Sequence, residues 1–396
     1  MDEVRPLVDC CAVDEEDRVL RPGVSPYAID PDPRKRPISR RRILRRASML
    51  GAVAFATACG TEDSDVGAAE SASPRASDDS SGESSAPSAS SKPTDLQALD
   101  LPYCSQILCG VPLETAVSRG FFEDEGLKVK LVYMKGGALT VQALLGKSVD
   151  FVGAAMDVVV SAAATGKEPV MVASLSSLPF FALVTSPDSD IDDIDGLKGK
   201  KIGVANLNTS DHLLARYLLE KNGIDDEDAS FAPLGPNLFD GLRKNQVDAG
   251  LVQEPALSKL EGLGCKVLVN FMKKEDVEKY LGGPYQFFGL NTRQDVVDDK
   301  PELLGKLVRA LTKSNEWIRA NSGADIVKNL PEDLVSGDDR ATFAARLDAV
   351  KSDLYPAELT LDSGAVQRVI DVQESAGALA KPVKADKVFT NSFVES

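Results

Sequence analysis

Short apolar runs alternate with stretches of helical spacing from residue 96 onward, and this alternation restricts the fold more than any other feature. No internal repeat is visible, which argues against a solenoid or a propeller. The pattern predicts an α/β protein with two lobes, each a parallel sheet flanked by helices. Strands are predicted at 96–101, 127–133, 151–153, 170–174, 201–204, near 231, and at 249–252, 266–268 and 287–290; helices at 113–119, 140–145, 158–164, 212–222, 238–244, 302–320 and 363–374.

The N-terminal region carries an export signal. Residues 39–45 read SRRRILR, and an apolar stretch interrupted only by small residues follows at 47–58. The paired arginines resemble a twin-arginine signal, which implies export of an already folded chain. Residues 1–58 are therefore expected to be an N-terminal extension followed by a signal peptide.

The apolar stretch ends in Ala-Thr-Ala immediately before Cys59, which resembles the processing box of a bacterial lipoprotein. We expect Cys59 to become the lipid-bearing N-terminus and to hold the protein at the extracytoplasmic face of the cell membrane, because two or three acyl chains anchor firmly. A plain signal peptide with an incidental cysteine and a short core helix are the alternatives. Neither explains the segment that follows Cys59.

That segment, residues 59–95, is predicted to be a disordered linker. Residues 60–95 contain 11 serines and no aromatic residue, so they cannot bury enough apolar surface to fold. A flexible chain of this length spans about 30–35 Å. The linker would let a tethered body reach a partner.

Charge and cysteine content narrow the partners. The formal net charge is −16, which repels nucleic acid, and no Gly-rich phosphate loop is present. The single histidine and the scattered cysteines provide no zinc set, so neither metal nor cofactor is expected. Cys104 and Cys109 are close enough in sequence to form a disulfide, with buried free thiols as the alternative. The expected partners are small molecules and proteins.

Four segments occur in the order found in one family of transport proteins. They are GFFEDEGLKV at 120–129, the glycine pair at 136–137 followed by ALLGKSVDF at 143–151, DGLKGKKIGV at 195–204, and QVDAGL at 246–251 leading to Glu254-Pro255. Together they resemble the solute-binding proteins of ABC transporters for sulfonate, nitrate, taurine and thiamine-pyrimidine precursors. Gly120 is read as a left-handed helix end whose phenylalanines turn into the core.

The resemblance implies a type 2 periplasmic-binding-protein fold. The first lobe is expected to span 96–182 and 288–396, the second 183–287, with hinge crossings near 181–186 and 287–289. Closure of the lobes around a solute would prepare a monomeric protein for delivery to an ABC permease. The protein is accordingly expected not to be an enzyme. A tethered ligand sensor is the alternative.

Ligands of open α/β sheets lie beyond the carboxyl ends of the strands, so the loops there supply the candidate ligand-binding residues. Several have a second interpretation as helix caps, tight turns or core; for Glu254 a ligand role is favoured. The acidic members, with no arginine in these loops, suit a ligand bearing an amine or amide better than a bare anion. The candidates are Tyr103, Ser105, Gln106, Gly136, Gly137, Met156, Asp157, Phe180, Thr209, Ser210, Asp211 and Glu254.

His212 makes an enzymatic alternative testable. Some pyrimidine-forming relatives of this fold are enzymes that use histidine and iron, and His212 is predicted beside the ligand site. One histidine makes no metal cluster, and no nucleophile elbow is present. A partly exposed helix position is the simpler interpretation of His212.

Overall fold

The computed structural model describes residues 95–104, 108–134, 136–225, 228–335 and 340–394. Cys59, the predicted signal segment and almost all of the predicted linker lie outside the described residues. The described chain contains two five-stranded sheets, which confirms the two-lobed α/β prediction.

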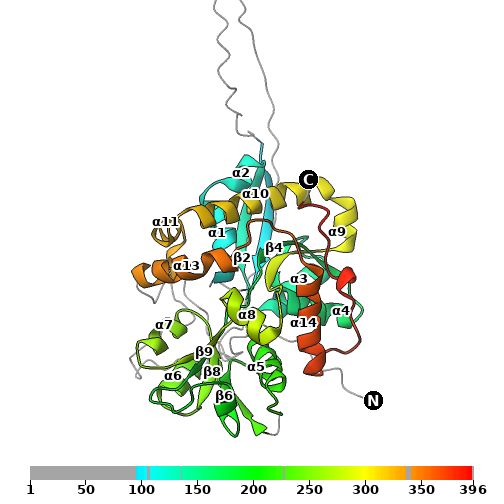
Figure 1. Cartoon of the computed structure of the whole chain (residues 1–396). Coiled ribbons are helices and arrows are strands. Elements are labelled where there is room, and N and C mark those ends of the chain that lie inside the picture. Colours follow the sequence, from blue (N-terminus) through cyan, green and yellow to red (C-terminus); the bar gives the residue numbers. More distant parts are fainter. Residues whose placement is uncertain (1–94, 105–107, 135, 226–227, 336–339, 395–396) are drawn as a thin grey trace, which may run out of the picture. The chain divides into compact units, whose positions relative to one another are not determined.

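The first sheet has the strand order β2-β1-β3-β10-β4 and the second the order β7-β6-β8-β5-β9. Figure 1 shows the first sheet with its cyan strands in the upper part and the second with its green strands in the lower part. The strands of the first are β1 (Gln97–Tyr103), β2 (Leu127–Tyr133), β3 (Val152–Ala155), β4 (Pro169–Ser176) and β10 (Phe288–Arg293). Those of the second are β5 (Ala182–Thr185), β6 (Lys201–Val204), β7 (Ser230–Pro233), β8 (Ala249–Val252) and β9 (Val267–Asn270).

Both sheets are mixed, whereas purely parallel sheets were predicted. In the first sheet β10 runs antiparallel to β3 and β4, and in the second β5 runs antiparallel to β8 and β9. These two strands are the ones that arrive from the other sheet. Ala182 pairs with Val252 and Phe288 with Ala155, so each arriving strand begins at the carboxyl end of its neighbour. Entry from that end forces the antiparallel direction.

Helices surround both sheets (Figure 1). Around the first sheet α10 packs on α1, α2 and β4, while α4 also packs on β4; around the second, α6 packs on β6 and β8. The helices are α1 (Val111–Ser118), α2 (Phe121–Asp124), α3 (Gly137–Leu145), α4 (Met156–Ala164), α5 (Ser210–Lys221), α6 (Leu238–Arg243), α7 (Ala256–Glu261), α8 (Lys274–Leu281), α9 (Gln294–Asp299), α10 (Pro301–Ala320), α11 (Gly323–Lys328), α12 (Glu332–Val335), α13 (Arg340–Leu354) and α14 (Ser363–Ser375).

Gly120 behaves as the sequence predicts. Its φ of 73° places it in the left-handed region directly after α1, where a side chain would be strained. The chain then turns so that Phe122 is fully buried against the core. The turn therefore serves the packing of the core.

Some elements escape the sequence pattern. Strand β5 is buried along its whole length, so it lacks the alternation that marks a half-buried strand. Helix α8 is mostly charged, and within it only Val277 and Leu281 are buried. These two residues are four apart, too little apolar periodicity to identify a helix.

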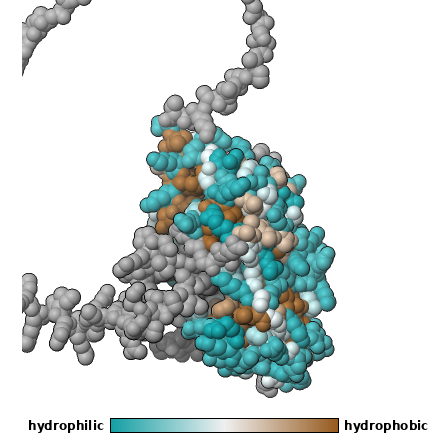
Figure 2. Space-filling view, turned by 90° about the vertical axis from the view of Figure 1, so that its left-hand side faces the viewer, coloured by the Kyte–Doolittle hydropathy of each residue, from teal (hydrophilic) through white to brown (hydrophobic). Residues whose placement is uncertain are grey.

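The visible surface is mainly hydrophilic. Figure 2 shows small hydrophobic areas separated by hydrophilic residues on one face. Among the described large hydrophobic residues, three are exposed: Leu139, Leu207 and Leu263. No helix in the described ranges is both long and apolar enough to cross a membrane.

Candidate functional site

Two helix N-termini meet where the sheets adjoin. Helix α4 starts directly after β3, and α5 follows β6 after a short loop, so both helices begin at carboxyl ends of strands. The hydroxyl of Ser210 donates a hydrogen bond to Oδ2 of Asp157. Both side chains are buried, with exposed fractions of 2% and 4%. The contact joins the first residue of α5 to the second residue of α4 across the two sheets.

Asp157 is held from several directions. Its Oδ1 accepts the backbone N–H of Val158 at 2.9 Å, and its backbone carbonyl accepts Nε2 of Gln373 at 2.8 Å. The N-cap residue of α4 is Ala155, and Met156 begins the helix. Asp157 therefore lies inside the first turn of α4 and is not its N-cap residue. Its carboxylate points instead toward α5.

The start of α5 contains its own carboxylate. Thr209 is the N-cap residue by backbone conformation, but its side chain makes no capping bond; its hydroxyl donates to the carbonyl of Asn206 at 2.6 Å and to Asp211. The other oxygen of Asp211 accepts the N–H of Ala205 at 2.5 Å. Burial raises the pKa of Asp211, and these hydrogen bonds only partly offset that rise.

Glu254 follows β8 and is 3% exposed. Its Oε2 accepts the N–H and the hydroxyl of Ser258 at 3.1 and 2.7 Å. Its Oε1 lies 3.6 Å from Nε of Arg346, a residue of α13. Arg346 also bonds Ser258 and pairs with Glu261 of α7. These partners account for the burial of Glu254, and a ligand role for it stays a prediction.

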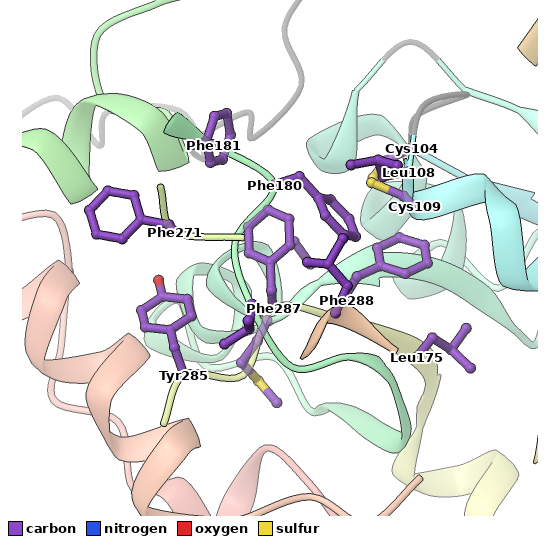
Figure 3. Close-up of a cluster of buried hydrophobic side chains, with 14 of the residues drawn as sticks. Cys104, Leu108, Cys109, Leu175, Phe180, Phe181, Phe271, Tyr285, Phe287 and Phe288 are labelled. Carbon is purple, nitrogen blue, oxygen red and sulfur yellow. The ribbon is translucent and has the colours of Figure 1, made fainter. Parts of the chain in front are cut away.

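The two aromatic candidates pack into the interior. Tyr103 donates its hydroxyl to Oε1 of Glu114 at 3.0 Å and lies beside the ring of Tyr133. Phe180 is 1% exposed and meets Phe287 edge to face, with ring centroids 5.1 Å apart. Figure 3 shows Phe180 among other buried rings near the crossing between the sheets. The sequence left open whether these two residues belong to the core, and the structure places both of them there.

The glycine pair begins α3. Gly136 has φ 105° and ψ 155°, a conformation that side chains rarely adopt. Its carbonyl accepts the hydroxyl of Thr140 at 2.9 Å, and Gly137 is buried in the first turn. The glycine pair therefore forms the turn into α3. This is compatible with the prediction that a ligand approaches its backbone closely, which stays a prediction. Ser105 and Gln106 lie outside the described residues.

His212 is 6% exposed, so it is not the partly exposed residue that the simpler interpretation required. Its Nδ1 accepts the N–H of Asn208 at 3.0 Å, and its ring meets Phe231 edge to face at 4.6 Å. Within the described ranges, no three potential metal ligands cluster. Cys104, Cys109 and Cys265 are all buried. His212 thus stabilises the loop before α5.

Sequence reasoning missed several residues near the Asp157–Ser210 contact. Gln373 of α14 bonds both Asp157 and, at 2.9 Å, Ser161. Tyr285 lies two residues before Phe287, whose carbonyl accepts the N–H of Met156 at 2.7 Å. Tyr217 lies seven positions after Ser210 on α5. Of these residues, only Tyr217 could have been found from the sequence, because seven positions after Ser210 is two helical turns and places it on the same face of the helix.

A family model described as NMT1/THI5 like matches residues 111–323. The chain belongs to this family. It is 26% identical over 280 residues to a putative aliphatic sulfonates-binding protein of Bacillus subtilis, covering 66% of this chain and 81% of the relative. It is 30% identical over 141 residues to a 4-amino-5-hydroxymethyl-2-methylpyrimidine phosphate synthase of Aspergillus parasiticus, covering 35% of this chain and 41% of the synthase.

The fold has close structural counterparts. The alkanesulfonate-binding protein SsuA from Xanthomonas axonopodis pv. citri, solved with bound MOPS, superimposes with a TM-score of 0.59 at 22% identity. The match covers 76% of this chain and 100% of SsuA. The predicted periplasmic-binding-protein fold is thereby confirmed for this member of the NMT1/THI5-like family.

Proposed function

We propose that this protein is the extracytoplasmic solute-binding component of an ABC importer. The observation that carries the proposal is the match to the aliphatic sulfonates-binding relative over 81% of that protein's length. The match to the pyrimidine synthase covers only 41% of the synthase. Binding without chemical conversion therefore fits better than catalysis.

The proposed mechanism is closure of two lobes around the solute. The first lobe comprises residues 96–182 and 288–396 and the second 183–287, with the chain crossing near 181–186 and 287–289. Both crossings lead into antiparallel strands at the carboxyl ends of the sheets. A rotation about these crossings would open or close the region where Ser210 meets Asp157.

The proposed ligand is a small molecule of the sulfonate, nitrate, taurine or aminopyrimidine class. The described candidates nearest the contact between the sheets are Met156, Asp157, Thr209, Ser210 and Asp211, all buried. Burial of polar side chains at two facing helix starts suits a site that encloses its ligand. A permease would then receive the solute from the closed protein, which we take to be a monomer.

Export and tethering complete the proposal. The twin-arginine segment would direct export, and lipidation of Cys59 would hold the protein on the outer face of the cell membrane, with residues 60–95 as a flexible linker. In a Cys59→Ser variant the protein should move from the membrane fraction to the soluble fraction. If both forms remain with the membrane, the tether is not Cys59.

The decisive experiment is mass spectrometry of the protein purified and sprayed under native conditions, followed by identification of any released solute. We expect a bound small molecule that leaves chemically unchanged. Calorimetry with sulfonates, nitrate, taurine and aminopyrimidines then ranks the candidates. A converted product would indicate the enzymatic alternative. Tight binding without transport in a strain carrying the permease genes would indicate a sensor.

A further inference from the structure

Helix α14 is attached to the first sheet by the chain on both sides of it. Before the helix, the carbonyl of Leu359 accepts the N–H of Ser174 in β4 at 2.8 Å. After the helix, the carbonyl of Val388 accepts the N–H of Met171 in the same strand at 2.9 Å. Within the helix, Gln373 is 1% exposed and bonds the start of α4. We therefore expect α14 to move with the first sheet.

Helix α8 belongs to the second sheet, since it packs on β9 and α5. Its N-cap residue, Lys273, makes no capping bond with its side chain. The N–H of Lys274 instead donates to Oδ2 of Asp353 at 3.3 Å. Asp353 lies on α13, which packs on α10 of the first sheet. Since the first N–H groups of a helix need acceptors from outside it, α8 obtains one of them across the two sheets.

The C-terminal end of α8 is bonded by an arginine of α14, and Figure 1 shows α8 between α13 and α14. Arg368 donates from Nη1 to the carbonyl of Leu281 at 2.8 Å and from Nε to the carbonyl of Pro284 at 3.1 Å. Gly282 and Gly283 lie between these carbonyls, with φ of 79° and 144°. A Cβ on Gly283 would lie 2.8 Å from Nη2 of Arg368. The glycine thus leaves room for the guanidinium, whose charge also suits the negative end of the helix dipole.

These bonds lie at the second crossing between the sheets. Residues 282–287 lead from α8 to β10. The N–H of Gln286 donates to the carbonyl of Ala365, one turn before Arg368 on α14, at 3.4 Å. The two glycines give the crossing backbone freedom, and Arg368 restrains it. Because α14 is attached to the first sheet, a rotation of the second sheet away from the first would have to break the bonds of Arg368.

We propose that Arg368 is a hinge latch, which stabilises the arrangement with the two sheets in contact and whose release permits the opening through which a solute enters and leaves. The inference rests on the proposed solute-binding function and adds a residue that sets the balance between closed and open protein. The half-buried guanidinium can exchange its two carbonyls for water. A shift of the balance toward the open form lowers the apparent solute affinity by the same factor.

Distances between nitroxide labels, one on each sheet, measure this balance directly by pulsed electron paramagnetic resonance. The labels are attached to Lys128→Cys on β2 and Ser230→Cys on β7, both exposed positions. The full chain is used with Cys10, Cys11 and Cys59 replaced by serine, because the other three cysteines are buried. No solute is added, so the result does not depend on knowing the ligand.

Arg368→Gln should raise the ratio of open to closed protein about threefold to tenfold, seen as a larger population at long label distances. Arg309→Gln is the matched control, because this arginine bonds Glu125 within the first lobe and should leave the distances unchanged. An unchanged distance distribution in Arg368→Gln would overturn the proposal.

Gly283→Ala tests the space that the guanidinium occupies. The added Cβ would displace the guanidinium, so the label distances should shift in the same direction as in Arg368→Gln. In combination with Arg368→Gln it should add no further shift, because the contact that it disturbs is already lost. An equal shift with and without Arg368 would show that backbone strain at position 283 sets the balance, which would overturn the proposal.

Failure of the hinge latch and failure of the proposed function give different results. A solute released in native mass spectrometry, together with unchanged label distances, would leave the proposed function standing without the latch. A shift of the distances with no solute detected would contradict the proposed function and retain the latch as a property of the fold.

Discussion

At the scale of single residues, Asp150, just before β3, lies between two cations, Arg293 at the end of β10 and Lys300. Its carboxylate bonds Nη2 of Arg293 at 2.9 Å and Nζ of Lys300 at 2.5 Å. Arg293 is largely buried and also donates to the carbonyls of Leu144 and Val149. Removal of the carboxylate would leave a buried guanidinium short of one partner, which is a costly change.

Asp150→Asn should lower the free energy of unfolding by about 1–2 kcal/mol at pH 7. Burial alone would raise the pKa of Asp150, but hydrogen bonds and charges from Lys300 and Arg293 outweigh it and lower the pKa below 3.8. The ionised carboxylate therefore stabilises the native state fully above pH 3.8, and this contribution disappears as the pH falls through the lowered value. Urea unfolding at several pH values checks whether the unfolding free energies of the wild type and the variant become equal in acid.

Asp299→Asn is the matched control, since this carboxylate is exposed at the end of α9, next to Lys300. It should leave the unfolding free energy within about 0.5 kcal/mol of the wild type. A gap between the wild type and Asp150→Asn that stays constant from pH 7 to strongly acidic conditions would contradict the ion-pair explanation.

At the scale of elements, α14 connects the two sheets. It packs on α4 and on α5, and Figure 1 shows it beside α5. Near its C-terminus, Ser375 donates to Glu220 at 2.7 Å and Arg216 donates to the carbonyl of Ala376 at 2.9 Å. Gln373 meanwhile bonds the backbone of Asp157. The position of α14 therefore affects the candidate site directly.

Asp362→Ala should destabilise this helix. Asp362 is the N-cap, and its Oδ1 accepts the N–H of Ala365 at 2.7 Å. Loss of such a cap costs about 1 kcal/mol, whereas asparagine replaces it well. Hydrogen exchange should accelerate in the first turn of α14 for the alanine variant and much less for Asp362→Asn. Equal acceleration in both variants would show that the cap is not the cause.

At the scale of the whole molecule, α13 is linked to α7 of the other sheet through Arg346. The Arg346 side chain is 37% exposed, and its guanidinium contacts Glu254, Ser258 and Glu261. Surface-accessible ion pairs contribute little individually. The Arg346 contacts join helices that belong to different sheets. They would therefore stabilise the protein only when the proposed lobes are closed.

Arg346→Gln should therefore weaken closure more than it weakens folding. The radius of gyration of the ligand-free protein should increase in small-angle scattering, and solute affinity should fall about twofold to fivefold, the equivalent of about 0.5–1 kcal/mol. Arg340→Gln, on the same helix but bonded to Val327, should affect neither quantity. If Arg346→Gln changes neither the radius of gyration nor the solute affinity, the Arg346 contacts do not contribute to closure.

Local sequence pattern was sufficient for most of the regular elements. Apolar spacing identified strands such as residues 127–133, 201–204 and 249–252, which agree with β2, β6 and β8. It failed for β5, because a strand buried on both faces has no alternation, and for charged helices such as α8. The direction of β5 and β10 was also out of reach, because it depends on where the chain crosses between sheets.

The sequence by itself determined that this is an α/β chain, and it placed Thr209, Ser210 and Asp211 just before a helix, because caps and apolar periods act over a few residues. Only the tertiary structure brought Asp157 to Ser210, 53 residues apart, and Arg346 to Glu254. It also brought Tyr285 within electrostatic reach of Asp157. Contacts of this kind arise from the packing of separate elements, and no local pattern records which side chains that packing will join.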